Sequence, residues 1–193
     1  TNKVAVWLSL FLFIGAFLVA VTQLSFLRTR FVEEFKATEI APPVGLATNS
    51  LNLRVGIYLC SWDVISQNWL IGTGIGDAQH ALDDCYNSYS TNAYKERVYN
   101  THNNYLGIAV STGMIGLALF LFMLLFHLTR SIAYENLLFL LFLVFVMTVF
   151  MAENILSRNH GVVFYSLFCS LFTRLNLQRW RLSGYAQEEA NVL

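Results

Sequence analysis

Charged residues are scarce in this sequence of 193 residues: 12 Lys and Arg and 12 Asp and Glu make up only 12% of it. Soluble domains carry about 25% charged residues. The formal net charge is zero and no block of basic residues occurs, which argues against nucleic acid as a partner. In place of charge, 56% of the residues are hydrophobic and 15% aromatic, and the mean hydropathy is +0.53. This composition predicts a membrane protein.

Cysteine is also rare. Of the three cysteines, Cys169 lies inside an apolar run, which leaves Cys60 and Cys85 as the pair able to form a disulfide. The sequence alone leaves open whether they pair.

Four segments approach the roughly 20 apolar residues that a spanning helix needs: residues 4–24, 105–128, 137–152 and 161–177. The first has no small-residue cleavage site after it, so we predict a transmembrane helix there and not a signal peptide. The sequence therefore predicts an all-α polytopic bundle of about four transmembrane helices. Because the chain begins without Met, we expect it to be the C-terminal piece of a longer polytopic protein.

Basic residues in short loops indicate which ends of the spans are cytoplasmic. They follow the second and fourth spans and precede the first: Arg130, Arg174, Arg179, Arg181 and Lys3. Both chain ends are thus predicted inside, with residues 178–193 as a cytoplasmic tail. Residues 25–104 become a large extracytoplasmic loop.

Part of this loop is predicted to be an amphipathic helix, at about residues 50–70. Apolar side chains recur there at steps of three and four: Leu51, Val55, Tyr58, Trp62, Ile65 and Trp69. Such a helix is expected to lie against the membrane surface or the bundle, with its aromatic side chains at headgroup level. A glycine-rich turn follows it, and residues 83–100 are predicted to be a polar loop without regular structure.

His102 lies in a polar cluster at the start of the second span, next to Asn103 and Asn104. A neutral imidazole can accept a proton from a hydroxyl at physiological pH, and the amides could orient it or bind sugar hydroxyls. The alternative is an ordinary helix entrance, with Asn103 or Asn104 as N-cap and Tyr105 as interfacial anchor.

Arg54 is the second candidate. Its planar guanidinium can donate two parallel hydrogen bonds to a phosphate or diphosphate, which suits binding of a lipid diphosphate at the membrane. The alternative is simple contact with lipid headgroups.

The glycine-rich segment GTGIG at residues 72–76 lacks the third glycine and the βαβ context of a dinucleotide site. We interpret it as a tight turn, or as a place where backbone amides of Gly74 and Gly76 approach a substrate phosphate. The nearby aspartates, Asp77, Asp83 and Asp84, are interpreted as solvated side chains, so no metal and no cofactor is expected.

Ionisable residues also gather in the turn between the last two spans: Glu153, Arg158 and His160. Glu153 and Arg158 could simply pair with each other. Yet the predicted topology puts this turn on the same side of the membrane as Arg54 and His102, and ionisable groups there are functional candidates. Together they suit attack of a hydroxyl on an anomeric carbon whose leaving group is a lipid diphosphate, with a base for the proton and arginines for the developing charge.

The order of these motifs resembles the O-antigen ligase family, over roughly residues 50–172. The most specific stretches are THNNYLGIAVSTGMIG (residues 101–116) and AENILSRNHGVVF (residues 152–164). The resemblance implies a membrane glycosyltransferase of the GT-C-like class in the bacterial inner membrane, with its active site facing the periplasm. Members have around a dozen spans, so this chain is expected to lack the N-terminal helices and, alone, to be a candidate inactive fragment.

The resemblance also implies roles. The donor would be a glycan on undecaprenyl diphosphate and the acceptor lipid A-core or another glycan, among membrane lipids. His102 would be the base and Arg54 a ligand of the diphosphate; Arg158, Glu153, Asn103, Asn104 and the two turn glycines are candidate substrate ligands, whereas His160 has little support. The nearest alternative is a polymerase of O-antigen or exopolysaccharide repeats. From a different class, a transporter or structural membrane subunit is disfavoured by the long polar loop.

Overall fold

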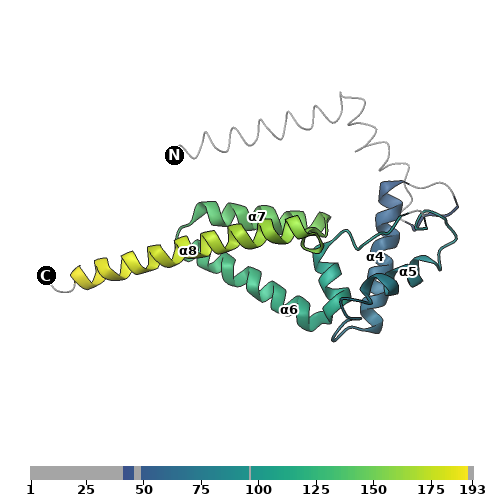
Figure 1. Ribbon diagram of the computed structural model, residues 1–193, viewed down its shortest axis with the longest axis horizontal. Coiled ribbons are helices and arrows are strands. Elements are labelled where there is room, and N and C mark those ends of the chain that lie inside the picture. Colours follow the sequence, from purple (N-terminus) through teal and green to yellow (C-terminus); the bar gives the residue numbers. More distant parts are fainter. Residues whose placement is uncertain (1–40, 46–48, 96, 191–193) are drawn as a thin grey trace, which may run out of the picture. The chain divides into compact units, whose positions relative to one another are not determined.

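The computed structural model describes residues 41–45, 49–95 and 97–190, and all regular elements within them are helices. The prediction of an all-α chain is confirmed. The predicted first span lies outside these residues. In chain order the elements are α4 (Ser50–Gln67), α5 (Ala78–Tyr86), α6 (Asn104–Ala133), α7 (Leu137–Ala152), the short 3₁₀ helix η2 (Ile155–Ser157) and α8 (Asn159–Ala190) (Figure 1).

The chain divides into two compact units, and α4 begins in the first of them. In the first unit Gly45 and Thr91 form an isolated β-bridge, and the Thr91 hydroxyl donates to the Gly45 carbonyl at 2.8 Å. The side-chain oxygen of Asn49 accepts from the amides of Leu51 and Asn52, at 3.0 and 2.8 Å. These bonds satisfy two of the amides that the first turn of α4 leaves without helical partners.

In the second unit, the remainder of α4 is joined to α5 by a disulfide between Cys60 and Cys85, whose Cα atoms are 5.6 Å apart. The sequence had left this pairing open. Ile57, Ser61 and Val64 are buried on the same side of α4 as Cys60. The spacing of three and four residues between these positions is that of one helical face.

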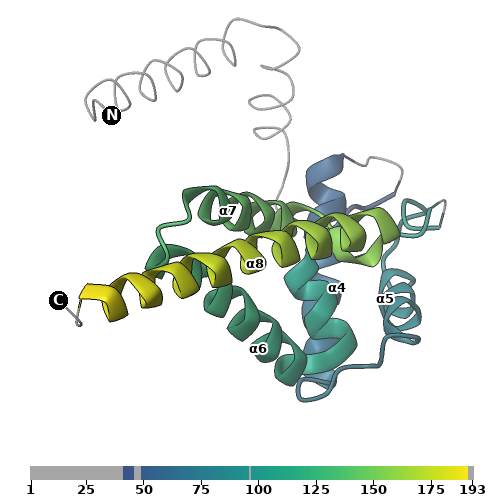
Figure 2. The ribbon, with the colours of Figure 1, turned by 60° about the vertical axis from the view of Figure 1, so that its left-hand side comes forward.

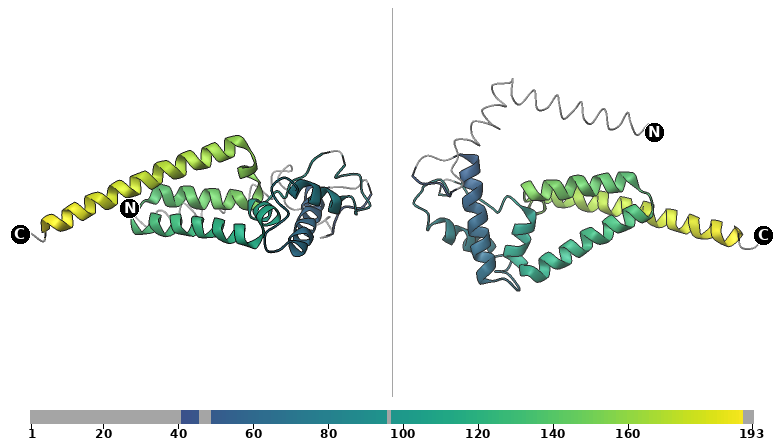
Figure 3. Two further views of the ribbon diagram at one scale, coloured as in Figure 1. Left: turned by 60° about the horizontal axis from the view of Figure 1, so that its bottom comes forward. Right: turned by 180° about the vertical axis from the view of Figure 1, so that it is seen from behind.

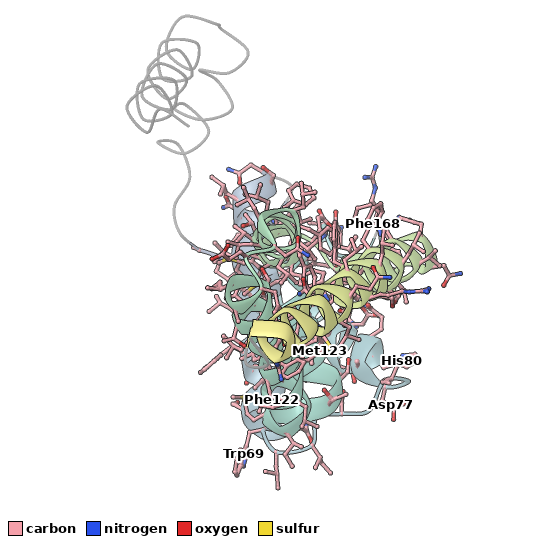
Figure 4. The ribbon with its side chains drawn as sticks, turned by 90° about the vertical axis from the view of Figure 1, so that its left-hand side faces the viewer. Trp69, Asp77, His80, Phe122, Met123 and Phe168 are labelled. Carbon is pink, nitrogen blue, oxygen red and sulfur yellow. A yellow bond between two sulfur atoms is a disulfide. The ribbon has the colours of Figure 1, made fainter. Side chains whose placement is uncertain are left out.

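The face of α4 that packs within this unit is therefore not the apolar stripe, and the expected contact of that stripe with the membrane surface stays a prediction. Of the six predicted positions only Ile65 is buried, whereas Trp62 is 68% exposed and Trp69 60% exposed. Trp69 also follows the end of α4 and projects at the edge of the molecule (Figure 4). The side that packs inward is the one that carries Cys60, which the disulfide joins to α5. The prediction of an irregular loop from residue 83 was also wrong at its start, because α5 extends to Tyr86.

Helices α6, α7 and α8 form an apolar bundle in the same unit (Figure 3). One part of its core contains Leu124 of α6 with Val146 and Phe150 of α7, and the other contains Phe139 and Leu143 of α7 with Cys169 of α8. Many other large apolar side chains point outward, for example Phe122, Phe145 and Val163, which are 68%, 62% and 63% exposed. Outward apolar surface on this scale marks contact with lipid or further helices.

Among the described helices, α6 is the one that is both long enough and apolar enough to cross a membrane. Its residues 114–133 cover about 30 Å at 1.5 Å per residue, the thickness of a bilayer's hydrocarbon core. Helix α7 is apolar but has 16 residues, about 24 Å by the same rise. The count of four spans therefore stays a prediction.

Helix α6 bends sharply at Gly113 (Figure 2), where the backbone leaves the helical region with φ 67° and ψ −168°. The loop after α4 satisfies the groups that the break frees. The amides of Met114 and Ile115 donate to the carbonyls of Trp69 and Leu70, at 2.8 and 3.3 Å. The amides of Thr73 and Gly74 donate to carbonyls that precede the break, those of Val110 and Ser111, each at 2.9 Å. The glycine-rich turn is thus a backbone clamp on the bend.

We predict that Gly113→Ala destabilises the protein, because an added Cβ would clash with the backbone carbonyl of Leu70. The left-handed φ adds a penalty of about 1–3 kcal/mol for a residue other than glycine. Fluorescence-detected size exclusion of detergent-solubilised protein after a heat ramp should show a lower melting temperature. Gly76→Ala is the matched control, since its Cβ would enter open space. Equal melting temperatures for the two variants would contradict the clamp.

Candidate functional site

The polar cluster before α6 holds His102 in an unusual backbone conformation. His102 has φ 45°, in the left-handed region that residues other than glycine seldom occupy. Its amide donates to the side-chain oxygen of Asn100 at 2.9 Å, a local turn that fixes this conformation. Asn103 follows as the N-cap of α6, accepting from the Leu106 amide at 3.1 Å. Asn103 is therefore the helix cap that one interpretation of the sequence predicted.

The imidazole of His102 faces the carboxylate of Glu153. Nδ1 lies 3.4 Å from Oε1 of Glu153, and the two side chains are 27% and 43% exposed. Nδ1 is buried and makes no closer polar contact. A separation of 3.4 Å is longer than a formed hydrogen bond, and catalytic hydrogen bonds are often this loose before substrate binds. The arrangement directs Nδ1 toward the carboxylate.

A buried hydrogen-bond pair holds the two halves of this site together. The hydroxyl of Thr101 accepts from the side-chain amide of Asn154 at 2.8 Å and donates to the Asn103 carbonyl at 2.8 Å. Thr101 is 1% exposed and Asn154 is 5% exposed. Gly107 allows this approach, because a Cβ there would lie 2.9 Å from Asn154 Nδ2. Since Thr101 precedes His102 and Asn154 follows Glu153, the pair holds the His102 imidazole close to the Glu153 carboxylate.

Two further asparagine contacts tie the start of α6 to the turn after α7. The Asn103 amide donates to the Met151 carbonyl at 3.2 Å, and the side-chain oxygen of Asn104 accepts from the Leu156 amide at 3.1 Å. Asn104 is buried. Both side chains therefore form hydrogen bonds that stabilise the fold. Their contact with substrate stays a prediction.

The other predicted residues are placed as follows. Arg158 is exposed in the turn that follows Glu153, and His160 is exposed in the first turn of α8. The backbone amide of Gly74 donates to the Ser111 carbonyl at 2.9 Å. The predicted contacts of Gly74, Gly76 and Arg158 with substrate stay predictions.

Arg54 lies in the second turn of α4 and is half-buried. It belongs to the first compact unit, whereas His102 and Glu153 belong to the second. Its role in binding the diphosphate stays a prediction from the sequence.

A series of aromatic rings that the sequence analysis did not assign leads to His102. The ring centroids are 4.7 Å apart for Tyr86 and Tyr94, 5.6 Å for Tyr94 and Tyr99, and 6.3 Å for Tyr99 and His102. Burial raises the pKa of the Tyr86 and Tyr94 phenols, so both remain protonated near neutral pH. The only sequence signal for this cluster was the number of tyrosines in a loop otherwise read as irregular.

No group of three or more His, Cys, Asp or Glu side chains in the described part of the chain is arranged to hold a metal ion. The expectation that no metal is required stays an expectation.

Comparison with known proteins gives one family. The sequence profile described as O-antigen ligase matches residues 1–121, which is more than half of the 193 residues. The matched region contains Arg54, the glycine-rich turn and His102, and it ends before Glu153. No protein in the curated collection matches the chain.

Thr101→Val is predicted to lower stability by about 1–3 kcal/mol, because the isosteric valine leaves the buried Asn154 amide without its partner. Thr101→Ser keeps the hydroxyl and is the matched control. Thermal unfolding of the detergent-solubilised protein measures both. A Thr101→Val protein as stable as the serine variant would show that the pair does not hold the site together.

Proposed function

The chain belongs to the O-antigen ligase family, and from this premise we propose that it forms the catalytic portion of a glycosyltransferase of the bacterial inner membrane. The donor is a glycan linked to undecaprenyl diphosphate, and the acceptor is a hydroxyl of a second glycan. The observation that carries the proposal is the pairing of His102 with Glu153 at 3.4 Å, at the mouth of an apolar helix of spanning length.

In the proposed reaction, the acceptor hydroxyl oxygen attacks the anomeric carbon of the donor. The bond from this carbon to the diphosphate breaks, and undecaprenyl diphosphate leaves with the electron pair. Nε2 of His102 takes the hydroxyl proton, while the Glu153 carboxylate stabilises the resulting imidazolium through Nδ1. Guanidinium groups, for which Arg54 and Arg158 are the candidates, offset the charge that develops on the diphosphate.

The acceptor chemistry is the same for a ligase and for a polymerase. In the first the hydroxyl belongs to lipid A-core, and in the second to a growing glycan. We propose the ligase reaction, because the family profile is that of O-antigen ligase. Family membership also argues against the alternative of a transporter or structural subunit.

The periplasmic location of the site is supported by the disulfide. Disulfides persist in oxidising compartments such as the periplasm and are rare in the cytoplasm. Cys60 and Cys85 lie in the segment between the predicted first span and α6. The distribution of basic residues gives the same orientation, with Arg130 at the far end of α6 from His102.

His102→Ala in the full-length protein is predicted to abolish glycan transfer, because it removes the proton acceptor. Glu153→Gln keeps the shape but removes the charge, so we expect kcat to fall at least about tenfold with little change in KM for the donor. Transfer is measured with purified lipid-linked donor and acceptor, and membrane insertion is checked in parallel.

His160→Ala is the matched control, since His160 is an exposed histidine in the first turn of α8. Its transfer rate should equal that of the unaltered protein. Full activity of the His102→Ala variant would rule out His102 as the base.

A further inference from the structure

A polar cavity of about 390 Å³ lies in the second compact unit, apart from the His102–Glu153 pair. It is lined by Asp83, Tyr86, Asn87, Tyr94, Lys95, Arg97 and Val98. Its volume falls in the range of about 300–1,000 Å³ of small-molecule sites. Nothing in the proposed transfer reaction uses these residues.

The lining contains a buried donor with no partner. Tyr86 is 3% exposed, and its hydroxyl makes no hydrogen bond. Buried polar groups of proteins are nearly always hydrogen-bonded, so this hydroxyl in the cavity lining is a donor whose capacity the chain itself leaves unused. Because burial raises the pKa of this phenol, the hydroxyl keeps its proton and is able to donate.

The charges of the lining residues give the cavity a preference for an anionic ligand. Lys95 and Arg97 are exposed at its edge and supply two cations. Asp83 is the one carboxylate among the described lining residues, and its side chain accepts from the Gln79 amide at 2.8 Å. The balance favours an anionic group, and the Asn87 amide and the tyrosine hydroxyl suit the sugar hydroxyls around it.

The cavity is also close to the site of chemistry. Tyr94 forms part of its wall and is linked to His102 through Tyr99, with centroid separations of 5.6 and 6.3 Å. The Tyr94 and His102 rings are therefore at most about 12 Å apart. A glycan of a few residues can occupy the cavity while its reacting end lies at the imidazole.

We propose that this cavity, defined by Tyr86, Lys95 and Arg97, is a subsite for an acidic sugar residue, one that carries a carboxylate, within the transferred or the accepting glycan. The substrate role rests on the proposed function, but the binding site does not depend on the identity of the base. The Arg97 guanidinium and the Lys95 ammonium bind the carboxylate. The Tyr86 hydroxyl and the Asn87 amide bind ring hydroxyls.

The test measures binding of two probes to the full-length protein in nanodiscs by isothermal titration. Trigalacturonate carries the carboxylates, and maltotriose is the neutral comparison. Trigalacturonate should bind at least tenfold more tightly, and Arg97→Gln should weaken it about tenfold. Arg174→Gln, a change at an exposed arginine of α8 outside the cavity, should leave the affinity unchanged. Equal affinities for the two probes, or no effect of Arg97→Gln, would overturn the proposal.

Two further arms separate the possible failures. His102→Ala should bind trigalacturonate as the unaltered protein does, whatever its transfer activity, so failure of the base assignment is distinguishable from failure of the subsite. In the transfer assay, competition of trigalacturonate with the donor assigns the acidic residue to the donor glycan, and competition with the acceptor assigns it to the acceptor. Binding without inhibition of transfer would overturn the role as a substrate subsite.

Discussion

The hydrogen bond between the Thr101 hydroxyl and the Asn154 amide, 2.8 Å long and buried, is the contact on which the site depends. It joins the residue before His102 to the residue after Glu153, which are 53 positions apart in the chain. The Asn103, Asn104 and Tyr105 side chains make further hydrogen bonds from the start of α6 to α7 and the turn after it. Its energy is modest, but burial makes either partner costly to leave unpaired.

A second constraint shapes the path of α6. The bend at Gly113 would leave backbone groups without partners in an apolar environment, where each costs several kcal/mol. The loop after α4 supplies these partners through its own amides and carbonyls. The glycine-rich turn and the bend thus stabilise each other, and Gly72 and Gly113 provide the two close backbone approaches. The straight part of α6 that follows is the length of a membrane span, which places His102 outside it.

The sequence predicted the all-α class and offered Asn103 or Asn104 as the N-cap of α6, because these follow from hydropathy and local spacing, and the structure selects Asn103. It did not predict the contact between the His102 and Glu153 side chains, which depends on how α6 packs against α7. It did not predict which side of α4 packs within its unit, because the disulfide at Cys60, left open by the sequence, lies on the side away from the aromatic stripe. The bend was missed because an interior glycine in an apolar run reads as part of a span.

The central claim is that Glu153 orients the His102 imidazole so that Nε2 is free to accept a proton. Nitrogen-15 NMR of histidine-labelled protein in micelles tests it most directly, with the His102 signals identified by their loss in His102→Ala. The account predicts that the neutral form of the ring carries its proton on Nδ1, and that Glu153→Ala loses that preference. A proton on Nε2 in the unaltered protein would contradict it.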